Sequence, residues 1–158
     1  MSLEQANEKA AGVSLPNFHD AELTLRLTSI EPHQFLQAPT YYFTMVDSES
    51  GESLGRINLR AASDFNMFIY SGHIGYNVDE KHQGNRFAAR SVLLLLPFAA
   101  QIGLDPLWIT CNPDNIASRR TCEIAGGELV EIVDVPEDTA IYRAGAHQKC
   151  RYRFRIST

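Results

Sequence analysis

Alternation of apolar and polar residues marks the strands in the first half of the chain. The clearest alternation runs from Glu22 to Ile30 and predicts a half-buried strand. Two more strands are predicted at Tyr41 to Val46 and Leu54 to Arg60, with a polar hairpin loop, Asp47 to Glu52, between them. An apolar run from Phe68 to Val78 predicts a fourth strand.

Helices enter the pattern in the second half. Apolar residues predict a helix from Phe87 to Gln101, and Gly103 follows as its stop signal. The remaining predicted elements are a strand at 107–111, a helix at 116–125, and strands at 128–135 and 150–156.

The element order is therefore β-β-β-β-α-β-α-β-β. It predicts a mixed α/β fold, with a largely antiparallel six- to seven-stranded sheet flanked by helices. Two glycines inside the fourth predicted strand, Gly72 and Gly75, indicate a bulge or a close approach of another backbone. Because no repeat or linker interrupts the pattern, residues 19–158 are expected to form one domain after a flexible tail of residues 1–18.

Composition narrows the classes of function. With 44% hydrophobic and 21% charged residues, the chain is typical of globular domains, and its net charge of −5 disfavours nucleic-acid binding. Its three cysteines, Cys111, Cys122 and Cys150, have no metal-binding spacing, so we expect reduced thiols, no metal and a cytoplasmic location. The longest apolar run, from Val92 to Ala100, is interrupted by Pro97 and is too short to span a membrane.

The segment Val78 to Ala88 carries the strongest chemical signal. It joins a predicted strand to a helix start, where backbone N–H groups lack partners and the helix dipole favours anions. Gln83, Gly84 and Asn85 are small or polar, which lets a phosphate approach the backbone. An ordinary strand–turn–helix connection would have the same pattern.

The same residues carry a family resemblance. Gln83-Gly-Asn-Arg86-Phe-Ala88 resembles the Gln/Arg-x-x-Gly-x-Gly/Ala signature of the GNAT N-acetyltransferases, which binds the pyrophosphate of acetyl-CoA. Arg86 departs from this signature, because a glycine is usual there. An arginine could itself contact a phosphate.

A second segment, Leu107 to Gly127, is similar to the other landmark of that family. It has a strand, then Asn-x-x-Ser, a helix and a closing glycine: Asn115, Ser118, Glu123 and Gly126 match, while Gly127 replaces the usual aromatic residue. Asn115 or Asp114 could equally serve as a helix N-cap, with Gly126 as the C-terminal cap.

The resemblance implies an acyl-CoA N-acyltransferase-like fold and direct transfer of acetyl from the co-substrate acetyl-CoA to an amine acceptor, in a ternary complex. The backbone N–H of Val78 would hydrogen-bond the thioester oxygen. The residues expected to bind the coenzyme are Val78, Gln83, Gly84, Asn85, Arg86, Phe87, Ala88, Asn115 and Ser118. Arg119 and Arg120 could reach its 3′-phosphate or remain exposed.

The proton-transfer groups stay open at this stage. Cys122 stands where many family members have a tyrosine that acts as general acid, and packing is the alternative role for this thiol. His73 falls near the family's catalytic glutamate and is a candidate base, or else a histidine with a structural role. Tyr76, Asp79 and Glu80 are further candidates, and water relays could replace a single base.

The acceptor cannot be identified from the sequence. The family's helices between its first two strands are replaced by a shortened segment, Glu31 to Thr40, so the tail, residues 136–148 or a second subunit of a homodimer would complete the acceptor site. Acidic residues between Glu123 and Asp138 would favour cationic amines if they border that site, and otherwise form a solvated face. The rival hypothesis is a non-catalytic acyl-CoA-binding or protein-interaction module on the same scaffold.

Overall fold

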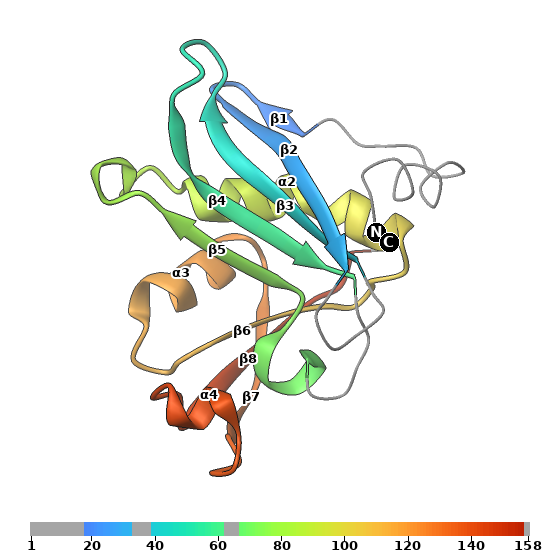
Figure 1. Cartoon of the computed structure of the whole chain (residues 1–158), viewed down its shortest axis with the longest axis vertical. Coiled ribbons are helices and arrows are strands. Elements are labelled where there is room, and N and C mark those ends of the chain that lie inside the picture. Colours follow the sequence, from blue (N-terminus) through green and yellow to red (C-terminus); the bar gives the residue numbers. More distant parts are fainter. Residues whose placement is uncertain (1–17, 33–38, 62–66, 157–158) are drawn as a thin grey trace.

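The computed structural model describes residues 18–32, 39–61 and 67–156 (Figure 1). The predicted flexible tail therefore lies outside the described residues except for Phe18, and so do residues 33–38 of the shortened segment. Within the described ranges, no helix is both long enough and apolar enough to cross a membrane. The same ranges contain no group of three His, Cys, Asp or Glu side chains that could hold a metal ion.

The first half of the chain forms a five-stranded antiparallel sheet in sequence order. Its strands are β1 (His19–Asp20), β2 (Leu23–Pro32), β3 (Pro39–Asp47), β4 (Ser53–Arg60) and β5 (Ile74–Val78). The predicted loop joins β3 to β4, and the Asp47 carboxylate caps it by accepting the backbone N–H groups of Glu49 and Ser50 at 3.0 and 2.8 Å.

The second half supplies a three-stranded antiparallel sheet in the order β6-β8-β7. These strands are β6 (Leu107–Cys111), β7 (Glu128–Asp134) and β8 (Gln148–Phe154). Acidic residues of β7 pair with arginines of β8: Glu128 with Arg153, and Glu131 with Arg151. These pairs neutralise part of the acidic stretch that the sequence analysis singled out.

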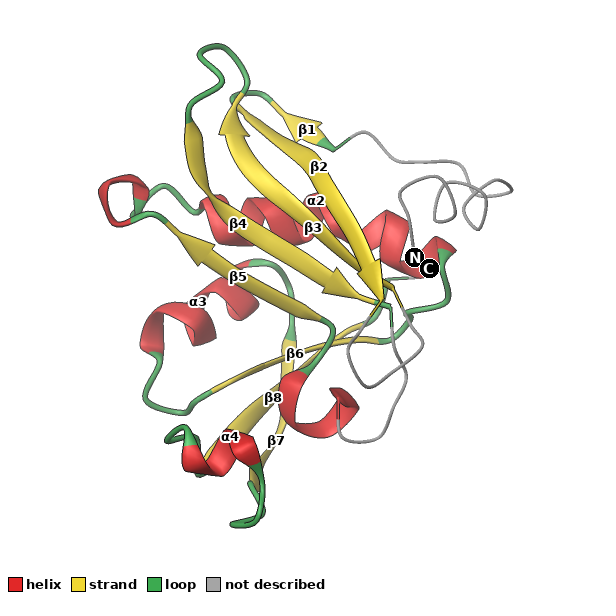
Figure 2. Ribbon diagram, viewed as in Figure 1, coloured by secondary structure: helices red, strands yellow, loops and turns green. Residues whose placement is uncertain are grey.

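The described residues also form three α-helices: α2 (Phe87–Gln101), α3 (Ile116–Ile124) and the short α4 (Ala140–Arg143). Helix α2 crosses one face of the five-stranded sheet (Figure 2), and its apolar residues Val92, Leu95 and Phe98 are at most 2% exposed there. Gly103 ends α2 as predicted, with φ +90° and its N–H bonded to the Ala100 carbonyl.

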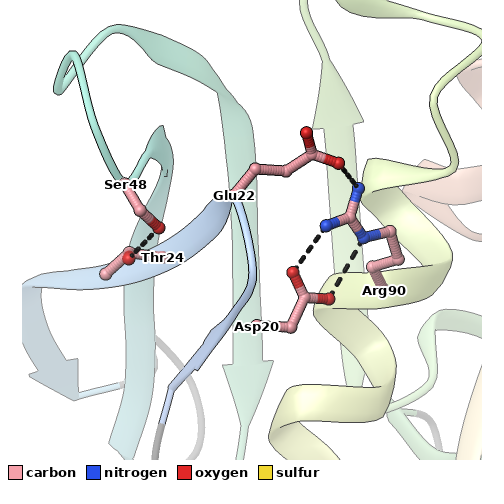
Figure 3. Close-up of polar contacts among 5 residues, drawn as sticks. All are labelled: Asp20, Glu22, Thr24, Ser48 and Arg90. Atoms are coloured by element: carbon pink, nitrogen blue, oxygen red, sulfur yellow. Dashed lines mark hydrogen bonds and ion pairs between the residues drawn. The ribbon is translucent and has the colours of Figure 1, made fainter.

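Arg90 ties the start of the sheet to α2 (Figure 3). Its guanidinium binds both oxygens of Asp20 at 2.6 and 3.1 Å and one oxygen of Glu22 at 2.8 Å. Bidentate pairing of this kind fixes orientation as well as distance. Beside it, the hydroxyls of Thr24 and Ser48 are 2.7 Å apart and connect β2 to the β3–β4 loop.

The predicted fold class is confirmed, but details differ, and the short elements β1 and α4 were not predicted. The fourth predicted strand is wrong in its first half, because residues Met67–Ser71 form a π-helix and β5 starts at Ile74. Gly72, at φ +67°, breaks the extended backbone between them. The strands also divide between two sheets instead of forming one, since β5 and β6 are not hydrogen-bonded neighbours.

Candidate active site

The chain just before β5 contacts the start of β6, and beyond that contact the two strands diverge. The backbone N–H of His73 donates to the Trp108 carbonyl at 2.7 Å, and the Trp108 N–H donates to His73 Nδ1 at 3.0 Å. Gly72 makes this contact close, because a Cβ there would lie 2.9 Å from the Trp108 carbonyl oxygen. Beyond that point the two strands separate, and α3 lies between their far ends (Figure 1).

The divergence leaves the outer edge of β5 without a strand partner. The Asp79 N–H donates to the Leu54 carbonyl at 2.9 Å, on the β4 side. Because successive N–H groups of a strand point to opposite sides, the Val78 N–H is directed away from β4 into the opening. This is the position in which a donor could meet an oxyanion.

The turn between β5 and α2 presents the start of the helix. Gln83 Nε2 donates to the Val78 carbonyl at 3.1 Å, and Asn85 Nδ2 donates to the His82 carbonyl at 3.1 Å. Arg86 precedes the helix with φ +61° and forms no side-chain cap. The first backbone N–H groups of α2 therefore have no capping side chain and are available to an anion.

The second motif forms the start and end of α3. Asn115, not Asp114, is the N-cap, and its Oδ1 accepts the Ser118 N–H at 3.1 Å. Gly126 ends the helix at φ +92°, as predicted. A Cβ on Gly127 would lie 2.5 Å from the ring of Phe154, so that ring occupies the space that a side chain at this position would need.

Tyr76 of β5 reaches across the opening to α3. Its hydroxyl lies 2.6 Å from Ser118 Oγ and 3.8 Å from Cys122 Sγ. Burial, followed by the neighbouring Cys122, raises the pKa of Tyr76 well above its ordinary value of 10.0. Burial also raises the pKa of the Cys122 thiol to about 12. Both groups therefore hold their protons at neutral pH.

These elements enclose a pocket of about 560 Å³, called the coenzyme pocket below. The predicted site residues that line it are Tyr76, Val78, Gln83, Gly84, Arg86, Phe87, Ala88, Asn115 and Ser118. The pocket therefore brings the two sequence motifs together. It excludes His73, which is 1% exposed, Cys122, which is 0% exposed, and Asn85, which shapes the turn instead. The further base candidates Asp79 and Glu80 do not line it either.

The coenzyme pocket is electropositive. Arg86 and Arg120 line it together with His82, and no carboxylate does so among the described residues. Of the two arginines that the sequence offered on α3, Arg120 faces the pocket, whereas Arg119 donates to the Tyr152 hydroxyl at 3.2 Å. His82 was not predicted from the sequence as a site residue, because no motif distinguishes it from its polar neighbours.

Comparisons with known proteins agree with this geometry. A family model described as an acetyltransferase (GNAT) domain matches residues 6–128. No curated protein matches the chain by sequence.

Solved structures with similar folds include three acetyltransferases. RimL, a ribosomal L7/L12 alpha-N-protein acetyltransferase, is 21% identical with a TM-score of 0.57, over 75% of this chain and 71% of that one. The ribosomal-protein-S5-alanine acetyltransferase from Vibrio fischeri is 19% identical with a TM-score of 0.58, over 75% and 62%. The microcin C7 self-immunity acetyltransferase MccE, in complex with acetyl-CoA and AMP, is 18% identical with a TM-score of 0.56, over 74% and 61%. The chain thus spans less than two thirds of the last two proteins, and at these identities the likeness shows the fold.

Proposed function

Because the chain belongs to the GNAT acetyltransferase family, we propose that it moves the acetyl group of acetyl-CoA directly to an amine acceptor in a ternary complex. The family match confirms the expected enzyme class and its co-substrate. The acceptor and the order of events belong to the proposal, as do the roles of individual residues.

The observation that carries the proposal is the coenzyme pocket itself. Its wall contains the uncapped start of α2 and the cationic side chains of Arg86 and Arg120. A pyrophosphate would accept hydrogen bonds from the first N–H groups of α2, at Phe87 and Ala88. The guanidinium groups of Arg86 and Arg120 would neutralise its charge. The pantetheine arm would then run past Asn115 and Ser118 toward the gap between β5 and β6.

Acetyl transfer at that gap has simple requirements. The amine nitrogen attacks the thioester carbonyl carbon, the carbon–sulfur bond breaks, and the amine proton leaves to solvent. The Val78 N–H would donate to the carbonyl oxygen as negative charge develops on it. The Tyr76 hydroxyl, held by Ser118 and protonated, would donate a hydrogen bond to the departing thiolate.

His73 and Cys122 take supporting roles in this proposal. His73 is buried and uses Nδ1 to accept the Trp108 N–H, so it holds β5 against β6 at the base of the opening. Cys122 packs in the core behind Tyr76, with a thiol that stays protonated. The acceptor's proton leaves through water.

The direct test is the thermal midpoint with and without millimolar acetyl-CoA, with ATP as a phosphate-rich control. Acetyl-CoA at about 100 times its dissociation constant adds roughly 2.7 kcal/mol of stability, which corresponds to a rise of roughly 5 to 10 °C. In the variant Arg86→Asp the shift with acetyl-CoA should disappear, because the new carboxylate repels phosphate. Its fold should survive, since aspartate tolerates a positive φ and suits a helix start.

Release of the CoA thiol in the presence of amines separates the proposal from its rival. An acetyl-CoA shift together with amine-dependent thiol release supports the transferase. A shift without thiol release for any amine in a broad panel would establish the non-catalytic acyl-CoA-binding module instead.

A further inference from the structure

A second pocket, of about 610 Å³, lies on the polar face of the five-stranded sheet. Its lining includes the side-chain positions Tyr42, Thr44, Arg56 and Asn58 of β3 and β4. We call it the sheet-face pocket. Both this pocket and the coenzyme pocket are lined by Tyr76 and Asn77 of β5.

The two pockets meet at β5 from opposite sides. Tyr76 pairs with Ile57 of β4, which is 1% exposed in the core under α2. The hydroxyl of Tyr76 reaches α3. Because side chains alternate along a strand, Gly75 and Asn77 face the other way, into the sheet-face pocket. A molecule in that pocket would therefore reach the thioester from the side opposite the coenzyme.

The sheet-face pocket has a cation and an unsatisfied acceptor. Among the described residues, Arg56 is the one charged residue that lines the pocket. The register places Arg26, Thr44, Arg56 and Asn77 in a single row across four strands. Neither Arg26 nor Arg56 forms an ion pair with a described residue. In the next row, Asn58 Oδ1 is buried and has no hydrogen-bond partner among the described residues.

We propose that the sheet-face pocket is the acceptor site and selects amines that also carry an oxyanion, either a carboxylate or a phosphate. Arg56 would bind the oxyanion, since its planar guanidinium matches either group, and Arg26 would add to the positive field. Asn58 Oδ1, which has no hydrogen-bond partner among the described residues, would accept an N–H of the amine. This inference rests on the proposed acetyl transfer.

The charges on this face oppose a preference for polyamines. The acidic residues that suggested cationic acceptors lie on α3, on β7 and after β7, and none of them lines the sheet-face pocket. By register, Glu31 on this face lies opposite Thr40, two rows away from Arg56. Arg60 lies in that same row and donates to the Ser71 and Gly72 carbonyls.

The test compares matched acceptors by the release of CoA thiol. The panel contains the common amino acids, their carboxamides, phosphoethanolamine and spermidine. We expect the carboxylate or phosphate amines to exceed the carboxamides and spermidine roughly tenfold or more in kcat/KM. Comparison of kcat/KM for the amino acids with that for phosphoethanolamine shows whether the carboxylate or the phosphate is preferred. Equal or better use of spermidine and the carboxamides would overturn the proposal while leaving acetyl transfer intact.

The variant Arg56→Gln tests whether Arg56 is the source of the selectivity for anionic amines. It should lower kcat/KM roughly tenfold or more for anionic amines, without lowering it for the carboxamides and with the KM for acetyl-CoA unchanged. The control is Arg155→Gln, which removes one exposed charge outside both pockets. An equal loss for all acceptors would show that Arg56 supports the fold and does not select the substrate.

A binding measurement keeps the inference independent of turnover. In the presence of unreactive CoA, the anionic amines should raise the thermal midpoint of the natural protein and not that of Arg56→Gln. Such a shift without thiol release would support the site and contradict the proposed catalysis. Absence of both the shift and turnover for anionic amines would contradict the inference.

Discussion

Arg86 occupies a backbone conformation that glycine adopts with less strain. Its φ of +61° lies in the left-handed region, which is unfavourable for residues with a Cβ by about 1 to 2 kcal/mol. The family signature has glycine at this position. The arginine is therefore tolerated at the expense of stability, which is expected of a side chain that binds a ligand.

We predict that Arg86→Gly raises the free energy of unfolding by about 1 kcal/mol while raising the KM for acetyl-CoA. The matched control is Arg120→Gly, which removes a second cation of the coenzyme pocket from the interior of α3. That change should lower stability by about 1 kcal/mol. Urea unfolding of both variants checks the opposite signs, and equal destabilisation would refute the strain argument.

Tyr76 gives the clearest pH dependence in the candidate site. Its pKa is raised by burial, so the folded protein binds this proton more tightly than the unfolded chain does. The resulting stability is complete below the unfolded pKa near 10 and is lost as the pH rises above it. Across pH 7 to about 9.5 the hydroxyl stays protonated and able to donate.

We predict that Tyr76→Phe lowers kcat roughly tenfold or more, with little change in the KM for acetyl-CoA. Above about pH 10, the variant should also lose less stability with rising pH than the natural protein. Tyr142→Phe on α4 is the control, because its ring stacks on His147 outside the coenzyme pocket. An unchanged kcat in Tyr76→Phe would remove this hydroxyl from the mechanism.

At the scale of elements, local patterns predicted most of the fold. The helix Phe87–Gln101 and the strand Leu107–Cys111 have the bounds that the sequence indicated. Hydrophobic periodicity and glycine stops decide these elements locally. The start of β5 could not be found this way. The apolar run before it is compatible with either strand or helix, and the break at Gly72 follows from its contact with Trp108, 36 residues later in the chain.

In the candidate site, too, the sequence predicted the local features and missed the contacts between residues far apart in the chain. Residues of the two motifs line the coenzyme pocket because helix starts are local structures that a short motif specifies. The contact between Tyr76 and Ser118 joins residues 42 positions apart, which no local pattern reveals. Likewise, only the fold shows that His73 is buried between β5 and β6 and does not face the coenzyme pocket.

The contact at Gly72 should control the opening between the two sheets. A Cβ at this glycine would meet the Trp108 carbonyl at 2.9 Å and the Thr110 nitrogen at 3.1 Å. We predict that Gly72→Ala costs about 2 kcal/mol or more, from the strained φ together with the backbone shift. Gly103→Ala is the control, with φ +90° but no atom within 4 Å of the new Cβ. It should cost only about 1 kcal/mol.

Thermal and urea unfolding measure this difference. Because the displaced backbone lies at the base of the opening, Gly72→Ala should also lower kcat, whereas Gly103→Ala should not. Equal losses of stability in the two variants would mean that the φ strain alone matters and that β5 and β6 adjust freely.

At the scale of the whole molecule, the two proposed substrate sites bear on the kinetic order. The pockets approach β5 from opposite faces and share Tyr76 and Asn77, so under the proposal both substrates would be bound at once. Two buried thiols lie near Ser118, and burial raises the pKa of Cys122 to about 12 and that of Cys111 to about 11, which disfavours a thiolate nucleophile. The geometry therefore favours direct transfer over a covalent acetyl-enzyme.

We predict intersecting, not parallel, double-reciprocal plots when acetyl-CoA and an accepted amine are varied together, because both must be bound before the carbon–sulfur bond breaks. Mass spectrometry of the protein after incubation with acetyl-CoA alone should find no stoichiometric acetyl adduct. Cys122→Ala, a control for the covalent route, should retain most of its kcat, although the cavity left in the core lowers its stability. Parallel plots together with an acetylated Cys122 would establish the covalent route and would require the core around α3 to open during turnover.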